Sequence, residues 1–240
     1  MSESYEYSEL FAVDLAFGKH LLSSYSNLSG EKGPAEFKEF LTRDPKTKIF
    51  RHDADSVQGF LKNLMASGKN AVTETSGKRV NYPKLPLVCY CRKPGLVSDD
   101  ESTGGAFNKK RIRFTDDETT LLKVKILSVV LTYRLAFVAR DKPTLDKLLL
   151  SWFAYVSDTI NNRHKFKVDF LVDGVDVDAV AVIHSPKSLS FDDESVTGET
   201  GRFFAAATSV EVSAPIFWGD VVEVVDPARI QYAWEVMEGA

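Results

Sequence analysis

The stretch from Leu121 to Ile160, LLKVKILSVVLTYRLAFVARDKPTLDKLLLSWFAYVSDTI, contains two hydrophobic periodicities in succession. In its first half, apolar residues alternate with Thr132, Arg134 and Ala136, which predicts a β-strand with one buried face. The apolar members of this alternation are Leu131, Tyr133, Leu135 and Phe137. The first half is therefore expected to be a half-buried strand.

After Asp141-Lys142-Pro143 the apolar residues recur at spacings of three and four. Such spacing places them on one stripe of an α-helix. Pro143 suits the first helical turn, where its missing N–H leaves no carbonyl without a partner. The predicted stripe consists of Leu145, Leu148, Leu149, Trp152, Phe153, Val156 and Ile160. A long strand is thus predicted to lead through a short proline turn into an amphipathic helix.

Upstream of residue 128 the apolar residues change parity. Leu122, Val124 and Ile126 occupy one parity, whereas Val129 and the apolar residues after it occupy the other. A parity switch indicates a β-bulge or a turn. Residues 121–140 are therefore expected to form either two strand segments or one long bent strand.

Downstream of the helix, two alternating runs flank Asp173-Gly174, and this arrangement predicts a β-hairpin. Asp169, Asp173, Asp176 and Asp178 also resemble fragments of a calcium loop, but no twelve-residue loop with a closing Glu follows. We interpret them as the polar outer face of the hairpin. Residues 202–214 and 216–225 predict a further pair of strands.

Residues 1–80 are less regular. Residues 8–28 fit either a strand followed by a helix or a single helix, and the following arm is rich in turn residues around a short helical segment at 35–41. Asp55 or Ser56 is a candidate cap for a helix that would end near Gly68. The face of that helix is predicted to consist of Val57, Phe60, Leu61 and Leu64. A strand is expected within 83–95, PKLPLVCYCRKPG.

Together these elements predict an α+β fold. We expect a mixed, mostly antiparallel sheet with a long amphipathic helix packed on it, an irregular N-terminal arm and long loops. The predicted division is an N-terminal helical or irregular segment, residues 1–80, packed on a main α+β domain, residues 81–240.

The composition is that of an ordinary globular protein. Apolar residues make up 44% and charged residues 27% of the chain, and the net charge is -4. No global basic field is present that would hold nucleic acid, and no apolar run reaches the roughly 20 residues of a membrane span. The N-terminus is acidic, unlike a signal peptide. We therefore expect an intracellular product without a membrane segment or a sequence-specific nucleic-acid partner.

Signatures of catalysis or cofactor binding are missing from the sequence. It contains none of the glycine-rich phosphate-binding motifs and no GxSxG elbow. Cys89 and Cys91 are too close on one strand for an unstrained disulfide and are expected to be buried thiols. The four histidines are isolated from one another, and the acid pairs lie in polar loops where desolvation is small. We predict no catalytic residue, cofactor or metal, and an enzyme is the least favoured class.

Two loops carry the candidate contact residues. Residues 95–120 and 185–201 are long for loops of a compact domain, which is typical of functional segments. The runs of like charge in them are interpreted either as solvated surface or as docking edges for a partner of opposite sign. The candidate interface residues are Asp99, Asp100, Glu101, Lys109, Lys110, Arg111, Arg113, Asp192, Asp193 and Glu194.

The order of these elements resembles that of tail terminator and related neck proteins of contractile-tailed bacteriophages. The resemblance covers residues 80–225 and comprises the proline-led strand KLPLVCYCRK, the strand and helix VVLTYRLAFVARDKPTLDKLLLSWFAYV, and the hairpins after them. The residues that carry it are Leu131 to Leu135 and Asp141 to Tyr155.

This resemblance implies a virion structural protein, made in the host cytoplasm and located in the tail or neck. Such a subunit would form a ring, usually of six copies, that joins the tail tube and sheath to the head connector. Its partners would be further copies of itself and the neighbouring tail and connector proteins. The alternative is a monomeric protein-binding or regulatory module with solvated loops.

Overall fold

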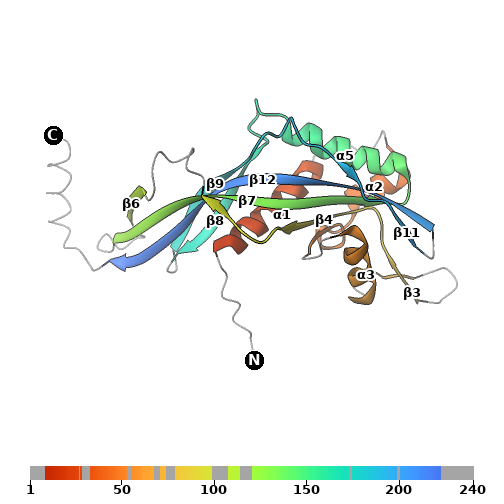
Figure 1. Cartoon of the computed structure of the whole chain (residues 1–240), viewed down its shortest axis with the longest axis horizontal. Coiled ribbons are helices and arrows are strands. Elements are labelled where there is room, and N and C mark those ends of the chain that lie inside the picture. The colour runs from red at the N-terminus through yellow and green to blue at the C-terminus, as the bar shows by residue number, and fades with distance from the viewer. Residues whose placement is uncertain are drawn as a thin grey trace.

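Two long paired strands, β7 and β12, run through the centre of the sheet of this α+β protein (Figure 1). The computed structural model describes residues 9–26, 28, 33–52, 56–67, 71–73, 79–98, 108–113, 121–172, 175–198 and 201–222. Strand β7 spans Leu121–Ala139 and pairs antiparallel along its whole length with β12, Gly201–Val222. The remaining elements are arranged around this two-stranded ribbon.

The sheet is mixed but mostly antiparallel, as predicted. Its central path has the order β1-β4-β7-β12-β9-β8, in which only β1 and β4 run parallel. The other strands of this path are β1 (Ile49–Arg51), β4 (Leu87–Arg92), β8 (Lys165–Val172) and β9 (Val175–Ile183). Short strands extend β7 and β12: β5 (Val97–Ser98) and β6 (Asn108–Arg113) pair with β7, and β10 (Asp192–Asp193) and β11 (Val196–Gly198) pair with β12. A separate pair consists of β2 (Ala71–Thr73) and β3 (Arg79–Pro83).

Helices cover both faces of the sheet. The helices are α1 (Glu9–Ser26), α2 (Ala35–Thr42), α3 (Val57–Ser67) and α5 (Lys142–Val156), with a short 3-10 helix at Pro45–Thr47. Residues of α1, α2 and α5 share one hydrophobic core with the sheet, whereas residues of α3 form a second core on the other face.

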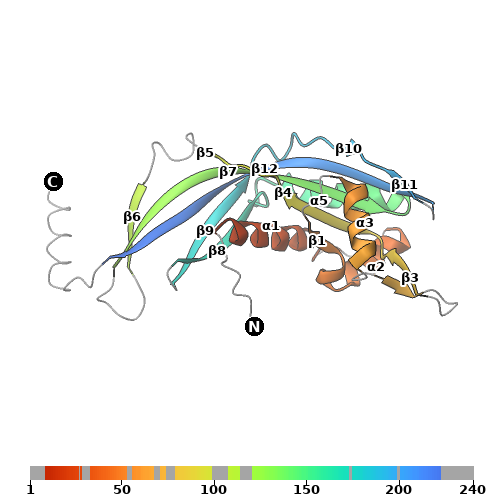
Figure 2. The same ribbon diagram turned by 60° about the horizontal axis from the view of Figure 1, so that its bottom comes forward.

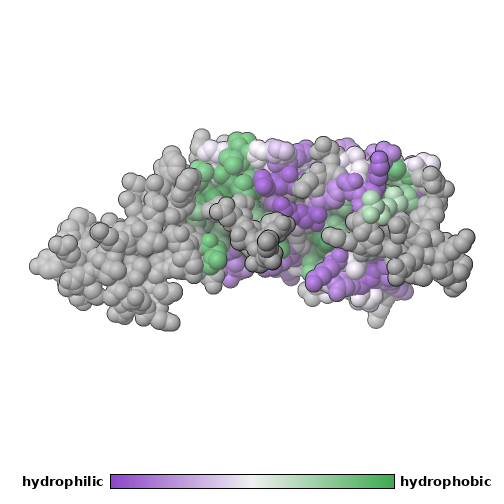
Figure 3. All heavy atoms as spheres, turned by 90° about the horizontal axis from the view of Figure 1, so that it is seen from below, coloured by the Kyte–Doolittle hydropathy of each residue, from purple (hydrophilic) through white to green (hydrophobic). Residues whose placement is uncertain are grey.

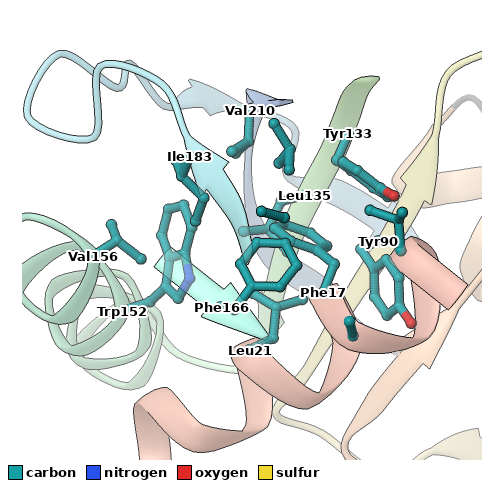
Figure 4. Close-up of a cluster of buried hydrophobic side chains, with 14 of the residues drawn as sticks. Phe17, Leu21, Tyr90, Tyr133, Leu135, Trp152, Val156, Phe166, Ile183 and Val210 are labelled. Carbon is teal, nitrogen blue, oxygen red and sulfur yellow. The ribbon is translucent and has the colours of Figure 1, made fainter. Parts of the chain in front are cut away.

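The larger core is organised around Trp152 of α5 and Tyr133 of β7, both fully buried (Figure 4). Trp152 lies 5.6 Å from Phe137, between ring centroids. On the other side of the core, Phe17 of α1 stacks on Tyr133 at 4.4 Å and also approaches Phe166 of β8 at 5.9 Å. Helix α1 therefore completes the core of the sheet although it belongs to the predicted N-terminal segment.

Residues of β7 that alternate with those of the larger core belong to the smaller core. Ala136 and Val138 point to the α3 side and are buried against Phe60 and Leu61. This part of β7 is covered on both faces, which is why its sequence loses the contrast between apolar and polar positions.

The predicted bulge or turn near Leu127-Ser128 is wrong, and the alternative of one long strand is correct. The register between β7 and β12 runs from Ala139 to Leu121 without a shift. The parity change therefore lies within one continuous strand and does not mark an inserted residue.

The two strands predicted within 202–225 form one strand, which is a second correction. Strand β12 passes through Pro215, opposite Ser128. Its pairing with β9 is confined to Val212 and Ser213, so the side of β12 without a partner accommodates the missing N–H of Pro215.

Helix α5 begins as predicted and ends earlier than predicted. The carboxylate of Asp141 accepts the N–H of Thr144 at 2.8 Å, and a proline occupies the first turn. The helix ends at Val156, and Ile160 is 91% exposed, so Ile160 does not belong to the buried stripe. The carboxylate of Asp158 accepts N–H groups of Asn161 instead, a local bonding pattern that competes with helix continuation.

The other local predictions have mixed outcomes. The hairpin is confirmed, because β8 and β9 pair up to Val172 and Val175, although residues 173–174 lie outside the described residues. Of the two alternatives for residues 8–28, the single helix is correct, since residues 9–26 form one helix, and the helical segment expected at 35–41 is confirmed as 35–42. Strand β3 crosses the predicted boundary at residue 80.

Candidate subunit interface

The basic segment from Lys109 to Arg113 was expected to lie in a long loop. It lies instead in strand β6. It pairs antiparallel with the first residues of β7. The segment has no regular alternation of its own, and its strand conformation follows from pairing with the long β7. The charges of the segment are therefore fixed in register with those of β7.

This register places basic residues of β6 opposite basic residues of β7. Lys109 lies opposite Lys125 and Arg111 lies opposite Lys123. Residues directly opposite on an antiparallel pair share a face of the sheet, as do residues two apart on one strand. The residues on this face, here called the cationic face, are Lys109, Arg111, Arg113, Lys123 and Lys125.

One acidic position of β12 lies in register with these basic residues. On the far side of β7, strand β12 places Asp220 opposite Lys123 and Trp218 opposite Lys125. Like charges directly opposite each other destabilise a sheet. These opposed basic positions are therefore treated as a candidate contact segment. Lys110 is opposite Val124 and lies on the other face.

The acidic residues at 192–194 are positioned by pairing of β10 with the beginning of β12. Asp192 and Asp193 are exposed. The carboxylate of Asp193 accepts hydrogen bonds from the hydroxyl and the backbone N–H of Ser195, at 2.5 and 2.9 Å, which lower its pKa. Both aspartates are accessible to solvent, and we call them the acidic end.

Asp193 also pairs with the exposed Arg202 at 3.9 Å, whereas Glu194 forms a more shielded contact within the chain. Its carboxylate pairs with the guanidinium of Arg134 on β7, and both side chains are largely shielded from solvent. It is a poorer candidate for contact with another molecule. The remaining predicted acidic residues, Asp99, Asp100 and Glu101, lie outside the described residues.

The cationic face and the acidic end lie at opposite ends of the same ribbon (Figure 2). Ala207 of β12 pairs with both Asp192 and Ala136, whereas β6 pairs with β7 around Lys123. At about 3.3 Å per residue, the path along β7 from Lys123 to Ala136 is about 40 Å. The two charged groups cannot meet within one chain.

A buried polar cluster fixes α1 to the sheet. Asp14 of α1 is almost fully buried and accepts hydrogen bonds from the hydroxyl of Tyr133 at 2.7 Å and from Arg92 at 3.1 Å. Arg51 forms an ion pair with the other carboxylate oxygen at 3.2 Å, and the hydroxyl of Tyr90 donates to the Asp14 carbonyl. Burial, followed by the charge of Asp14, raises the pKa of Tyr90 to about 12. These contacts hold α1 against the sheet, although the oxygen of Asp14 that faces Arg51 is paired by charge and not by a hydrogen bond.

A second group of polar and sulfur-containing side chains among the described residues lies beside α3. His52, Phe60 and Cys91 contribute to a small hollow beside α3, where Arg134 is already paired with Glu194. Burial raises the pKa of Cys89 to about 12, which keeps this thiol protonated. Within the described part of the chain, no group of three His, Cys, Asp or Glu side chains is arranged to hold a metal ion. Neither cysteine is in a disulfide; Cys89 is buried, as predicted, whereas Cys91 is only partly buried, contrary to the prediction.

Sequence reasoning missed Lys123 and Lys125 as members of the interface. The signal was available, because in Leu121-Leu122-Lys123-Val124-Lys125 the cations occupy alternate positions. Their significance depends on the pairing with β6, which a single sequence does not specify.

Comparison of the sequence with protein-family models and with curated proteins gives no significant match. Among the described helices, none has the length and apolarity needed to cross a membrane.

Proposed function

We propose that the chain is a virion structural protein of the tail-terminator or neck type. In this role it assembles into a ring that joins the tail tube and sheath to the head connector. The observation that carries the proposal is the register, which places the basic residues of β6 and β7 toward one end of the β7–β12 ribbon and Asp192 and Asp193 toward the other.

The separation of the two charged groups determines the kind of contact they support. Because they lie about 40 Å apart along β7, each can be neutralised by the other only in a neighbouring copy. A contact between different surfaces of two copies is heterologous, and it generates a closed ring or an open filament. The phage-tail resemblance favours the closed ring, usually of six subunits.

Electrostatic attraction of this kind predicts a specific solution behaviour. Contacts between exposed charges weaken as salt shortens the screening length, from about 10 Å at 0.1 M to about 3 Å at 1 M. We expect the purified protein to form a closed oligomer at low salt and to dissociate as salt is raised, as measured by light scattering.

A neutralised variant tests the role of the basic residues. Replacing Lys109, Lys110, Arg111 and Arg113 together with Ser should leave the far-UV circular dichroism unchanged and abolish the salt-sensitive oligomer. The matched control removes four exposed lysines elsewhere, Lys38, Lys46, Lys62 and Lys187, by the same change to Ser. It should assemble like the natural chain.

Two outcomes would contradict the proposal. One is an oligomer of unchanged mass and salt dependence in the neutralised variant. The other is equal loss of assembly in the control, which would trace the effect to net charge alone. A chain that stays monomeric under all conditions would instead favour a protein-binding module.

A further inference from the structure

Strand β8 forms one edge of the sheet and is well exposed on its outer face. In the described part of the chain it pairs with β9 only. Lys167, Asp169 and Leu171 on its outer face are 56 to 71% exposed, whereas Phe166, Val168 and Phe170 on its inner face are buried. The strand is therefore a half-buried element with one open side.

The pairing of β8 with β9 fixes which backbone groups point to that open side. The N–H of Ile183 donates to the carbonyl of His164 at 2.8 Å. Bonded pairs alternate along an antiparallel ladder, so the even-numbered residues of β8 bond β9. The N–H and C=O groups of Lys167, Asp169 and Leu171 therefore point away from β9, toward the open edge.

The sequence of this edge is self-complementary about Val168. Phe166 and Phe170 are placed symmetrically on the inner face, and Lys167 and Asp169 are placed symmetrically on the outer face. We propose that β8 pairs antiparallel with β8 of a second copy across a two-fold axis at Val168.

In this arrangement Lys167 of each copy lies opposite Asp169 of the other. Both residues direct their backbone groups to the open edge, so each of the two symmetric pairs contributes two main-chain hydrogen bonds. The inner face would continue as Phe166 opposite Phe170 and Val168 opposite Val168. A one-residue slip would place buried positions against exposed ones, so the pattern favours this register.

Charge within the edge also favours a second copy. Asp169 lies directly opposite Asp178 on β9, and a single ammonium group, that of Lys167, bridges both carboxylates at 3.2 and 2.9 Å. These hydrogen bonds raise the pKa of Lys167 and lower that of Asp169. In the proposed pairing each Asp169 also lies opposite Lys167 of the other copy, so opposite charges face each other twice across the axis.

Apolar surface lies beside the edge. Leu171 is 71% exposed, and Leu15 of α1 is 49% exposed. Leu15 lies one helical turn before Lys19, whose charge reaches Asp169. Viewed from below, apolar surface gathers where the β8–β9 hairpin and the start of α1 lie (Figure 3). A second copy at the edge would cover part of it.

The β8 contact does not depend on the proposed ring. A two-fold contact uses the same surface on both copies and stops at a dimer, and it involves neither the cationic face nor the acidic end. It therefore persists in a variant in which the end-to-end contact has been removed.

Charge reversal tests the contact by sedimentation of the full chain carrying the four Ser replacements at 109–113. We expect a monomer–dimer equilibrium. Lys167→Asp should raise its dissociation constant about tenfold, because two opposite-charge pairs become like-charge pairs. The double variant Lys167→Asp with Asp169→Lys restores opposite charges across the axis and should return the dissociation constant to within about threefold of its starting value.

The matched control is Lys62→Asp, the same charge reversal at an exposed position on α3, which should leave the equilibrium unchanged. The inference is overturned if the chain is monomeric at all concentrations up to about 1 mM. It is also overturned if Lys167→Asp leaves dimerisation unchanged, or if the double variant stays as weak as the single one. Circular dichroism of each variant shows whether it is folded.

Discussion

At the scale of single residues, Asp14 is the charged group on which the position of α1 depends. It is buried, and its carboxylate connects three strands through Arg51, Arg92 and Tyr133. A buried charge without partners is strongly destabilising, whereas a charge with a full set of partners is tolerated. The cluster therefore specifies where α1 docks more than it adds net stability.

Removal of the carboxylate should be more damaging than removal of one partner. Asp14→Ala leaves the guanidinium groups of Arg51 and Arg92 facing a buried hydroxyl. Because both guanidinium groups retain access to water, we expect the free energy of unfolding to fall by about 3 kcal/mol, the lower end of the range for such substitutions. Tyr133→Phe removes one hydrogen bond to a charged group and should cost about 2 kcal/mol. Urea unfolding measures both, and equal small losses would show that α1 docks through apolar contacts alone.

His20 gives the stability of the fold a defined pH dependence. Its ring stacks on Phe166 at 5.0 Å, and burial, with the nearby charges of Arg163 and His164, lowers its pKa to about 4. The unfolded chain binds this proton near pH 6.5. The free energy of unfolding should therefore fall between pH 6.5 and pH 4, by about 3 kcal/mol from this group, and be flat above pH 6.5.

The His20→Phe variant isolates that contribution, because it retains a ring on Phe166 and removes the titration. The difference in unfolding free energy between the natural chain and the variant should change between pH 7 and pH 4.5. A difference that stays constant over this range would contradict a buried neutral histidine.

At the scale of elements, the N-terminus of α5 is determined by its own sequence. Asp141 caps the helix and Pro143 occupies its first turn, and both features were predictable because they depend on residues within one turn. Its C-terminus was predicted too late, since the Asp158–Asn161 turn competes locally with the helix. Local chemistry therefore accounts for both ends once the turn is recognised.

The cap of α5 has an expected magnitude. Asp141→Ala removes the acceptor for the Thr144 N–H and should lower the free energy of unfolding by about 1 kcal/mol. Asp141→Asn keeps an acceptor at the cap, so the free energy of unfolding should fall by only about 0.3 kcal/mol. Thermal or urea unfolding of the pair would contradict this role if both substitutions had the same effect.

The long strands show where hydrophobic patterns mislead. A parity change along β7 was interpreted as a bulge, and Pro215 as a break in β12, but both strands are continuous. The pattern reports which face of a strand is covered. The hydrophobic pattern does not show where a strand ends, because the length of a strand depends on its pairing with distant residues.

At the scale of the whole molecule, the α+β class and the central sheet followed from the sequence, because the strand and helix periods are clear between 121 and 183. The candidate interface followed only in part. The charged residues were recognisable as runs, but their location on one face, and the separation of opposite charges along β7, required the registers of β6 and β10. Registers between distant segments are not encoded locally.

The central claim, that one copy's cationic face binds the next copy's acidic end, is tested most directly by complementation. One variant carries Ser at 109, 110, 111 and 113, and the other carries Asp192→Asn and Asp193→Asn, both in the Lys167→Asp background that suppresses the β8 contact. Each should be monomeric alone by light scattering at low salt. Their equimolar mixture should form a one-to-one dimer and nothing larger, since only one productive contact is possible. A mixture that remains monomeric, or a single variant that still forms the full oligomer, would contradict the claim.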